Sequence, residues 1–511
     1  MRFRLLLCLC FLGLMNAHAQ NAAPEVQVLS AGFDLGTNEF VVQCDLTDAE
    51  TDTVTLVVQV SVDSGRTFPA EGIRLSQVIT NTGPQFVRFS WPPVPNPLIT
   101  RLRVMAYDKN APDIAAMVAA VDSQRLLDNL TWIAAVRHRT AGPVQLEAVK
   151  DSLENRFSAS GYQVRRQNFP FGSFTGQNII GRAQGLLQDT VTYILDGHFD
   201  SVPTSPGAND NGASVAALVE ISRVLSQYTF ANSIQYIGFD LEEDGLVGAI
   251  NYLRSGRISG DSIHGVLNLE MIGYYDNRPN TQQLPAGFNL LLPTVYQQIA
   301  QDSFRGNFIA NVGNTASQRL IDAFQTEAAN YVPNLISYGV PIPGNGQIAP
   351  DFRRSDHAPF WDVGIPALML TSGADFRDPN YHGPNDTLGN VDIRFAREVA
   401  QAALATLATL AEPINGTAEV TEFTLGRNLS IQNRLDPQAV ALFPNPGSSS
   451  FFLDTDLRVE AVNVYDTQGK LVKQFHAHKQ SRYPTKDLPN GMYVVQVQTS
   501  EGTWTGKWIK G

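Results

Sequence analysis

Residues 191–200 read Val191-Thr-Tyr-Ile-Leu-Asp-Gly-His-Phe-Asp200, in which an apolar run leads into a histidine and an aspartate. A short apolar run of this kind predicts a buried strand. Similar apolar runs occur three more times further along the chain, at 234–239, 266–269 and 366–371. Helical patterns accompany them, at 145–158, 213–225 and 396–410. Strands that alternate with helices predict a parallel or mixed sheet covered by helices.

This central α/β region extends over residues 115–413, and the chain on either side of it has a different pattern. Between 24 and 114, short alternating runs broken by Gly, Pro, Asn and Asp predict an N-terminal immunoglobulin- or fibronectin-like β-sandwich. Residues 436–511 show the same alternation and predict a second, small β-sandwich after a polar linker at 414–435. The expected fold is therefore multidomain, which the length of 511 residues also favours.

The composition excludes two classes of protein. Apolar residues make up 43% and charged residues 17% of the chain, which disfavours global disorder. The chain has 49 Asp and Glu against 37 Lys and Arg, a net charge of −12, and its basic residues form no cluster. Because a phosphate backbone is bound through clustered Lys and Arg, we expect no nucleic-acid partner.

The first 19 residues have the pattern of a secretory signal peptide. Arg2 and Arg4 precede an apolar run at 5–14, and Ala17-His-Ala19 then offers a small-x-small cleavage site. No later stretch reaches the roughly 18 uninterrupted apolar residues that a membrane-spanning helix needs. We therefore expect an exported protein without a membrane span.

Chemically reactive side chains follow the apolar runs of the central region, where each predicted strand should end. His198 and Asp200 follow the first run, Glu242 and Glu243 follow the second, and Glu270 follows the third. In open α/β sheets, ligands bind at the carboxyl ends of the strands. We therefore expect these side chains to project from one edge of the sheet.

Two further side chains are expected in the same acidic nest. Asp210 lies in a glycine-rich loop that leads into a predicted helix, and His382 follows the run at 366–371. A mixture of imidazole and carboxylate ligands suits zinc, and a carboxylate between two metal ions would bridge them. Of the adjacent Glu242 and Glu243 only one can comfortably bind a metal, so the other is free to take a proton from metal-bound water.

Six short motifs, in this order, resemble those of the M28 metallopeptidases, which are exopeptidases with two catalytic zinc ions. Any one of the motifs is a weak signal, but six in order are specific. The resemblance implies a zinc-exopeptidase fold for the central region, with two zinc ions as cofactors. The motifs are His198-Phe-Asp-Ser-Val202, Gly207-Ala-Asn-Asp-Asn-Gly-Ala-Ser214, Phe239-Asp-Leu-Glu-Glu-Asp-Gly-Leu246, Asn268-Leu-Glu-Met-Ile-Gly273, Ser355-Asp-His-Ala-Pro-Phe360 and Tyr381-His-Gly-Pro-Asn-Asp-Thr387.

The same resemblance implies metal-binding roles for five side chains. One zinc ion would be held by His198 and Glu270, and the other by Glu243 and His382. Asp210 would bridge the two ions. Many members of the family have Asp where this chain has Glu270, so we expect the extra methylene to be absorbed by a backbone shift or by altered coordination.

Further roles near the metals are implied by the resemblance. Glu242 becomes the general base. Asp200 would accept a hydrogen bond from His198 and fix the tautomer of the imidazole. Tyr381 would donate a hydrogen bond to the oxyanion of the tetrahedral intermediate. The motif at 355–357 is expected to shape the pocket, because neighbours in sequence cannot converge as a serine-hydrolase relay.

Four pieces of the last segment resemble the C-terminal sorting domain that the type IX secretion system reads. They are Phe443-Pro-Asn-Pro446, the alternating runs at 462–472 and 491–497, and a final Lys507-Trp-Ile-Lys510. The resemblance implies that the type IX machinery is a partner of this chain. It also implies passage through the periplasm and the outer membrane, so that the protein is secreted or held at the cell surface.

The leading hypothesis is a secreted zinc aminopeptidase, in which metal-bound hydroxide attacks the first peptide bond of a peptide substrate. Carboxypeptidase activity stays open on the same fold. A glutaminyl cyclase, which shares the fold but uses one zinc ion, is disfavoured by His198. A catalytically silent binding or adhesion protein is disfavoured by Glu242 and Tyr381. The pocket walls are expected from residues 276–350, whose sequence does not reveal the preferred N-terminal residue.

Overall fold

The computed structural model describes the chain from residue 22 to residue 511 with several gaps. The chain divides into two compact units, whose described residues lie within 22–31 and 42–424 for one and within 32–41 and 425–511 for the other. The predicted signal peptide at 1–19 lies outside the described residues. The gaps are residues 50–52, 66–67, 69–72, 80–81, 92, 109–110, 427–439, 467–469, 477–481 and 500–502.

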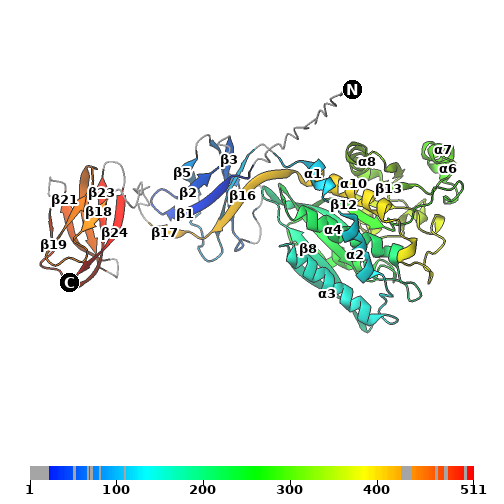
Figure 1. The fold of residues 1–511 in the computed structure, drawn as a ribbon, viewed down its shortest axis with the longest axis horizontal. Helices are drawn as coiled ribbons and strands as arrows, with labels where there is room; N and C mark the ends of the chain where they lie inside the picture. The colour runs from blue at the N-terminus through cyan, green and yellow to red at the C-terminus, as the bar shows by residue number, and fades with distance from the viewer. Residues whose placement is uncertain are drawn as a thin grey trace, which may run out of the picture. The chain divides into compact units, whose positions relative to one another are not determined.

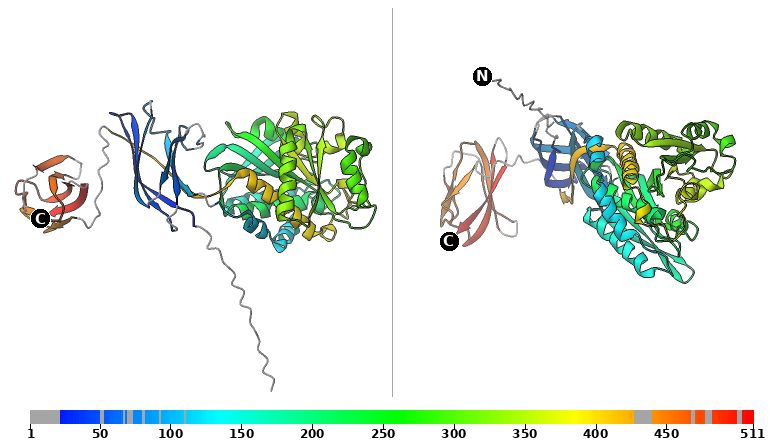
Figure 2. Two further views of the ribbon diagram at one scale, coloured as in Figure 1. Left: turned by 90° about the horizontal axis from the view of Figure 1, so that it is seen from above. Right: turned by 45° about the vertical axis from the view of Figure 1, so that its right-hand side comes forward.

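An eight-stranded mixed sheet forms the core of the central domain, which is coloured from cyan to yellow in Figures 1 and 2. The strand order is β14-β13-β15-β12-β9-β11-β8-β7. Strands β15, β12, β9 and β11 run parallel, whereas β13 and β8 pair antiparallel with β15 and β11. The predicted mixed sheet is confirmed. The bounds are β7 Gln163–Phe171, β8 Phe174–Ala183, β9 Gln188–His198, β11 Asn232–Phe239, β12 Ser262–Glu270, β13 Phe308–Asn314, β14 Ile336–Ile342 and β15 Ala367–Thr371.

Alternate residues of the strands contribute to two apolar cores, one on each face of the sheet. In β9, Leu195 belongs to the larger core and the adjacent Ile194 to the smaller one. Because helices cover both faces, the strands read as nearly continuous apolar runs. Over the larger core lie α1 Ile114–Ala119, α2 Ser123–Ile133, α3 Pro143–Ala159, α4 Ala213–Leu225, α8 Gln318–Tyr331 and α10 Ile393–Ala411. Over the smaller core lie α5 Val247–Asn251, α6 Phe288–Leu291, α7 Pro293–Gln301 and α9 His357–Asp362.

The three helices expected from the sequence correspond to α3, α4 and α10. Helix α4 is buried on almost every side, and it begins directly after the glycine-rich loop that carries Asp210. Helix α10 begins where the side chain of Asp392 accepts a hydrogen bond from the backbone N–H of Phe395, which is a common N-cap arrangement. Of the helices in the described residues, none combines the length and apolar character needed to cross a membrane.

Two strands that follow the central domain in the sequence, β16 and β17, complete the N-terminal β-sandwich. Its sheets have the orders β17-β1-β2-β5 and β10-β16-β6-β3-β4. Strand β16 runs antiparallel to β6, with Thr417 opposite Ala106. The central domain is therefore inserted between two strands of the sandwich, and β16 occupies the first part of the segment 414–435 assigned above to a linker. The bounds are β1 Glu25–Asp34, β2 Glu39–Thr47, β3 Val54–Ser61, β4 Ile73–Ile79, β5 Gly83–Ser90, β6 Arg101–Asp108, β10 Thr229–Phe230, β16 Pro413–Thr421 and β17 Thr424–Gly426.

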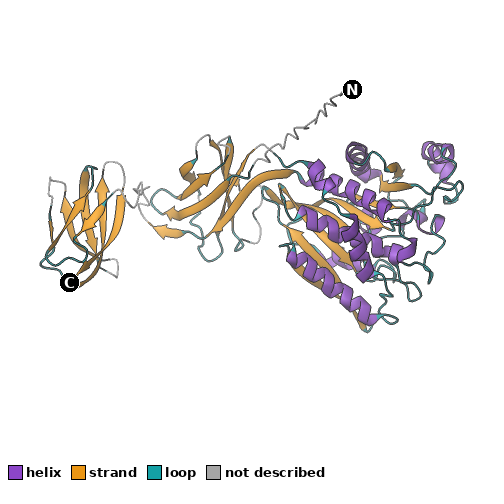
Figure 3. Ribbon diagram, viewed as in Figure 1, coloured by secondary structure: helices purple, strands orange, loops and turns teal. Residues whose placement is uncertain are grey.

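Two small sheets form the C-terminal domain, with the strand orders β18-β19-β22 and β21-β20-β23-β24. The indole N–H of the buried Trp508 donates to the carbonyl of Pro444 at 3.0 Å, and the backbone N–H of Ile509 donates to the Asn445 side chain at 3.0 Å. The first and last motifs of this segment therefore pack together. Figure 3 shows the helices of the central domain, and it draws the described residues of the other two domains as strands and loops. The bounds are β18 Ala441–Phe443, β19 Ser450–Asp454, β20 Val459–Tyr465, β21 Leu471–His476, β22 Tyr483–Pro484, β23 Gly491–Thr499 and β24 Thr503–Lys510.

Candidate metal centre

Three neighbouring parallel strands deliver most of the expected site residues to one edge of the sheet. Strand β9 ends at His198 and β12 ends at Glu270. Strand β11 ends at Phe239, which lies opposite His198, and the loop after it carries Glu242 and Glu243. The expectation that these side chains share one edge agrees with the register of the strands.

The expected metal-binding side chains converge into two groups that share Asp210. The Nε2 atom of His198 lies 3.5 Å from Asp210 Oδ1 and 3.5 Å from Glu270 Oε2. The Nε2 atom of His382 lies 3.2 Å from Asp210 Oδ2 and 3.2 Å from Glu243 Oε2. In each group the potential ligand atoms all lie within 4.8 Å of one another. We call the group with His198 and Glu270 the strand half, and the group with Glu243 and His382 the loop half.

A third grouping involves Glu242. With His198 and Glu243 it also offers three potential ligand atoms within 4.8 Å. Its Oε2 atom lies 3.9 Å from His198 Nε2, farther than the carboxylates of the strand half. Glu242 therefore lies beside the two halves, and it belongs to neither of the groups that share Asp210.

The hydrogen-bonding state of the site fits a pair of cations. Asp210 Oδ2, Glu243 Oε1 and His382 Nε2 are buried atoms that form no hydrogen bond in the described structure. His382 Nε2 lies 3.2 Å from a carboxylate oxygen of Asp210 and from one of Glu243, but neither contact has the geometry of a hydrogen bond. The three side chains therefore leave their ligand atoms directed at one shared position between them. Nitrogen and carboxylate oxygen donors in this arrangement suit zinc.

Electrostatics point to the same requirement for positive charge. Burial raises the pKa of Glu242 well above its ordinary value, although His198 opposes this shift. Burial and the charge of Asp210 raise the pKa of Glu243 to about 7. Burial alone would lower the pKa of His382, but Asp210 and Glu243 raise it to about 10. Carboxylates that must otherwise bind protons are a favourable environment for a divalent cation.

Asp200 has a wider role in the geometry than the sequence indicated. Its Oδ1 atom lies 3.4 Å from His198 Nδ1, while the hydrogen bond of that ring nitrogen, at 3.3 Å, is made to the backbone carbonyl of Asp200. The Asp200 carboxylate accepts hydrogen bonds from the backbone N–H groups of Glu242 at 3.1 Å and Glu243 at 3.2 Å. Asp200 thus orients three site residues at once.

Tyr381 lies over the ring of His382, with ring centroids 3.7 Å apart and an interplanar angle of 22°. Arg354 donates a hydrogen bond to the Tyr381 hydroxyl oxygen at 3.0 Å. Burial raises the pKa of Tyr381, so the hydroxyl keeps its proton at neutral pH. Because its oxygen already accepts from Arg354, the Tyr381 proton is available for donation elsewhere.

Two residues have supporting roles that the sequence did not assign, although the motif at 355–357 was expected to shape the pocket. The Ser355 hydroxyl donates to Glu270 Oε2 at 2.7 Å, which holds the longer glutamate side chain in the strand half. The Asp386 carboxylate accepts from the backbone N–H groups of Asn209 at 2.7 Å and Asp210 at 3.0 Å. Both lie inside quoted motifs, yet their partners are more than 80 residues away in sequence, which no local pattern reveals.

The loop that carries Asp210 is also fastened to the end of β12. The Asn211 side chain donates to the carbonyl of Leu269 at 2.9 Å and accepts from the N–H of Met271 at 2.9 Å. These two bonds flank Glu270 in the sequence. The positions of Asp210 and Glu270 are therefore coupled through the backbone as well as through the shared group.

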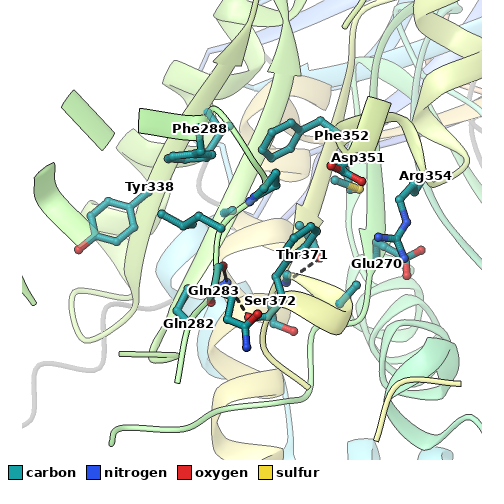
Figure 4. Close-up of a pocket in the computed structure, with 18 of the residues that line it drawn as sticks. Glu270, Gln282, Gln283, Phe288, Tyr338, Asp351, Phe352, Arg354, Thr371 and Ser372 are labelled. Carbon is teal, nitrogen blue, oxygen red and sulfur yellow. Dashed lines mark hydrogen bonds between the residues drawn. The ribbon is translucent and has the colours of Figure 1, made fainter. Parts of the chain in front are cut away.

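A cavity of about 80 Å³ opens beside the metal-binding side chains (Figure 4). Glu270 and Arg354 lie together at one end of the view, and Phe288 and Tyr338 lie at the other. Much of the wall comes from residues 276–350, as the sequence analysis expected. The apolar part of the lining includes Leu284, Phe288, Ile299, Phe308, Val340, Phe352, Met369 and Phe376.

Two family models match the chain, and each covers a different domain. The model of Peptidase family M28 matches residues 178–407. The model of the secretion system C-terminal sorting domain matches residues 441–511.

Among curated relatives, the chain is 30% identical over 277 residues to the uncharacterized protein YfbL of Escherichia coli, covering 50% of this chain and 77% of that protein. It is 28% identical over 262 residues to the probable lipoprotein aminopeptidase LpqL of Mycobacterium tuberculosis, covering 45% and 46%. Among solved structures, the LapA aminopeptidase of Legionella pneumophila is 16% identical with a TM-score of 0.46, covering 58% of this chain and 74% of that one.

Proposed function

Because this chain belongs to peptidase family M28, we propose that its central domain is a zinc-dependent aminopeptidase that removes residues from the free N-termini of peptides. One observation carries the proposal. Asp210 is shared between two groups of ligand atoms, each with one imidazole and one further carboxylate. This arrangement fits two ions with a bridging carboxylate, and a two-metal site is a common device for peptide hydrolysis.

Each half of the centre would hold one zinc ion. His198 and Glu270 would hold the first ion, Glu243 and His382 the second, and Asp210 would bridge them. Zinc, when bound, lowers the pKa of its water to about 7 and polarises a carbonyl group. Asp200 orients the strand half through His198 and the base-bearing loop through two backbone N–H groups.

Glu242 is proposed as the general base and Tyr381 as the oxyanion donor. The Glu242 carboxylate lies next to His198 outside both ligand groups, so it is free to accept a proton and to return it to the leaving amine. Tyr381 stands beside His382 with its hydroxyl proton unused by Arg354. A donor at this position would stabilise charge that develops on the carbonyl oxygen.

The cavity beside the centre supports a substrate with a large apolar N-terminal side chain. Its lining is dominated by aromatic and aliphatic side chains, and Glu270 and Tyr381 connect it to the metal-binding side chains. A Phe or Leu side chain buried there would gain roughly 1.5–3 kcal/mol relative to water. A charged side chain would lose hydration without a partner in the apolar part of the pocket.

The C-terminal domain supports export. The chain carries a secretion system C-terminal sorting domain. We propose that the type IX machinery recognises it and delivers the enzyme through the periplasm to the cell surface or the medium. Truncation before Ala441 is expected to leave peptidase activity intact and to retain the enzyme in the periplasm, and normal export of the truncated chain would contradict the proposal.

Mass-spectrometric analysis of a peptide library digested with the purified protein tests the catalytic proposal. Stepwise loss of N-terminal residues, fastest for Phe, Leu and other large apolar residues, is the expected result. Loss of C-terminal residues would favour a carboxypeptidase, and pyroglutamate formation a glutaminyl cyclase. A library that stays unchanged in the presence of zinc would indicate a non-catalytic binding protein.

A further inference from the structure

Arg137 is a buried cation without an acidic partner. It lies in the loop between α2 and α3, and its side chain has no exposed surface. Among the described residues no carboxylate forms an ion pair with it. Its guanidinium instead donates to five backbone carbonyls, those of Phe199 at 2.7 Å, Ile133 at 3.0 Å, Ala135 at 2.8 Å, Pro206 at 2.7 Å and Gly207 at 2.9 Å.

Three of these five carbonyls belong to the segment between two expected zinc ligands, His198 and Asp210. The backbone of Arg137 is fastened to the same segment. Its N–H donates to the Ser201 hydroxyl at 2.9 Å, and its carbonyl accepts from the Ser201 N–H at 3.1 Å. The loop at 199–207 is therefore wrapped around one guanidinium group.

Gly207 connects this arrangement to Asp210. Its φ is +62°, in the left-handed region that favours glycine. A Cβ atom at this position would lie 2.3 Å from the Asp210 carbonyl oxygen and 2.7 Å from Arg137 Nη2. The turn that leads into Asp210 thus packs directly against the Arg137 side chain.

Acidic side chains near the metal-binding residues help to keep Arg137 positively charged. Burial lowers its pKa to about 10, while Asp200, Asp210, Asp386 and Glu243 act to raise it. The group is therefore a cation at neutral pH. Burying an unpaired charge is costly, and the hydrogen bonds to five carbonyls, three of which share the two N–H groups of Nη1, offset that cost together with the nearby acidic groups. An apolar side chain would remove this donor from all five carbonyls, of which those of Ile133 and Gly207 also accept from the backbone N–H groups of Ala135 at 2.8 Å and Gly212 at 3.0 Å.

We propose that Arg137 is a positioning residue that presets the loop at 199–210, so that His198, Asp200 and Asp210 converge before zinc binds. The inference rests on the zinc site proposed above. Arg137 touches neither the expected ligands nor the substrate cavity, so its effect on zinc binding would pass through the loop backbone.

Competition titration of zinc against a chromophoric chelator, with the metal-free full-length chain, tests this role. Arg137→Met should weaken zinc binding by roughly 10- to 100-fold, the range seen when residues that orient metal ligands are removed. Arg137→Lys should weaken it as well, because an ammonium group keeps the charge but offers only about three N–H donors in place of the guanidinium fork. At saturating zinc, kcat should recover only partly, because the loop stays misplaced.

Arg103→Met is the matched control for loss of a buried arginine. The side chain of Arg103 is 4% exposed and bonds to Gln59 and to the Gly185 carbonyl, in the sandwich and its contact with the central domain. Its replacement should lower the thermal stability of the metal-free protein and leave zinc affinity unchanged. Arg137 variants that behave in the same way would overturn the proposal, as would wild-type zinc affinity in Arg137→Lys.

Ser201→Ala covers the case in which the Arg137 variants do not fold. It removes the bond between the loop and the Arg137 N–H, and with it the bond of the hydroxyl to the Ser205 carbonyl at 3.2 Å, so zinc should bind a few-fold more weakly. Unchanged affinity in Ser201→Ala would then contradict the inference. A wild-type chain that binds no zinc would instead refute the proposed zinc site, so the two failures are distinguishable.

Discussion

The two halves of the metal centre share Asp210 but are built in different ways. In the strand half, His198 and Glu270 stand at the ends of adjacent parallel strands, and the His198 side chain is 1% exposed. In the loop half, Glu243 and His382 come from loops, and the His382 side chain is 38% exposed. The difference teaches that a sheet edge supplies a buried half, whose Glu270 also lines the cavity, while loops supply a half whose histidine reaches the solvent.

Removal of the metal should have the largest effect on activity, and the two halves should lose their zinc at different rates. A strong zinc chelator is expected to abolish peptide hydrolysis completely, because both halves are needed. Zinc should leave the loop half first, since its histidine is the exposed one. Metal content and activity, measured over time after chelator addition, check this order. His382→Ala should lack the fast phase, and simultaneous release of both ions would contradict the comparison.

Glu242→Gln should lower kcat by roughly 10²- to 10⁴-fold, the contribution typical of a general base. Glu242 lies outside both halves, so the variant should still bind two zinc ions. Kinetics on an aminoacyl anilide and metal analysis of the same sample measure the two quantities. Asp244→Asn is the matched control, because Asp244 pairs with Arg139 and should leave turnover unchanged. A near-normal rate in Glu242→Gln removes it as the base.

Acid should destabilise helix α9, which begins just after Ser355, the residue whose hydroxyl holds Glu270 in the strand half. His357 begins α9, its ring is fully buried, and its Nε2–H donates to the Phe352 carbonyl at 2.9 Å. Burial lowers the pKa of His357 from 6.5 to about 4. The unfolded chain therefore binds more protons between these values, so stability falls as the pH drops from 6.5 to 4.

Over that range the wild type should lose about 3 kcal/mol more unfolding free energy than His357→Gln, since a pKa difference of one unit corresponds to about 1.4 kcal/mol. Denaturant unfolding of both metal-free proteins at pH 7 and pH 4 measures the difference. Glutamine keeps a donor for the Phe352 carbonyl and does not titrate. Parallel losses in the two proteins would show that His357 is not the titrating group.

Ser355→Ala should have the smallest effect and should act on one half only. It removes the hydroxyl that holds Glu270 Oε2, so zinc binding by the strand half should weaken about tenfold. Stepwise zinc titration should show one weakened site and one unchanged site. Ser317→Ala, at another buried serine that is bonded to Asn314, serves as control and should alter neither site. Equal weakening of both sites would mean that the halves are not separable.

The strand half was the easier one to anticipate from sequence. The run that begins at Val191 predicted a strand, and that strand does end at His198. Glu270 ends its strand in the same way, so periodicity and strand ends were sufficient to bring the two together. His382 lies in a loop well beyond the end of β15, and its assignment to the same half as Glu243 came from the family resemblance.

Other features could not be read from any local pattern. Strand β16 lies in polar sequence, and it is a strand because β6, more than 300 residues earlier, offers it an edge. Arg137 looks like an ordinary basic residue of a loop. Its burial and its five carbonyl partners depend on how the segment at 199–207 folds around it.

The sequence by itself determined the identity of the elements and of the chemical groups. Apolar runs become strands and helices through local periodicity, and imidazole and carboxylate side chains keep their affinity for divalent cations in any fold. Only the tertiary structure decided which carbonyls, hydroxyls and carboxylates surround those groups. The reason is physical: a buried polar group must find a partner, and packing selects that partner from segments far apart in the chain.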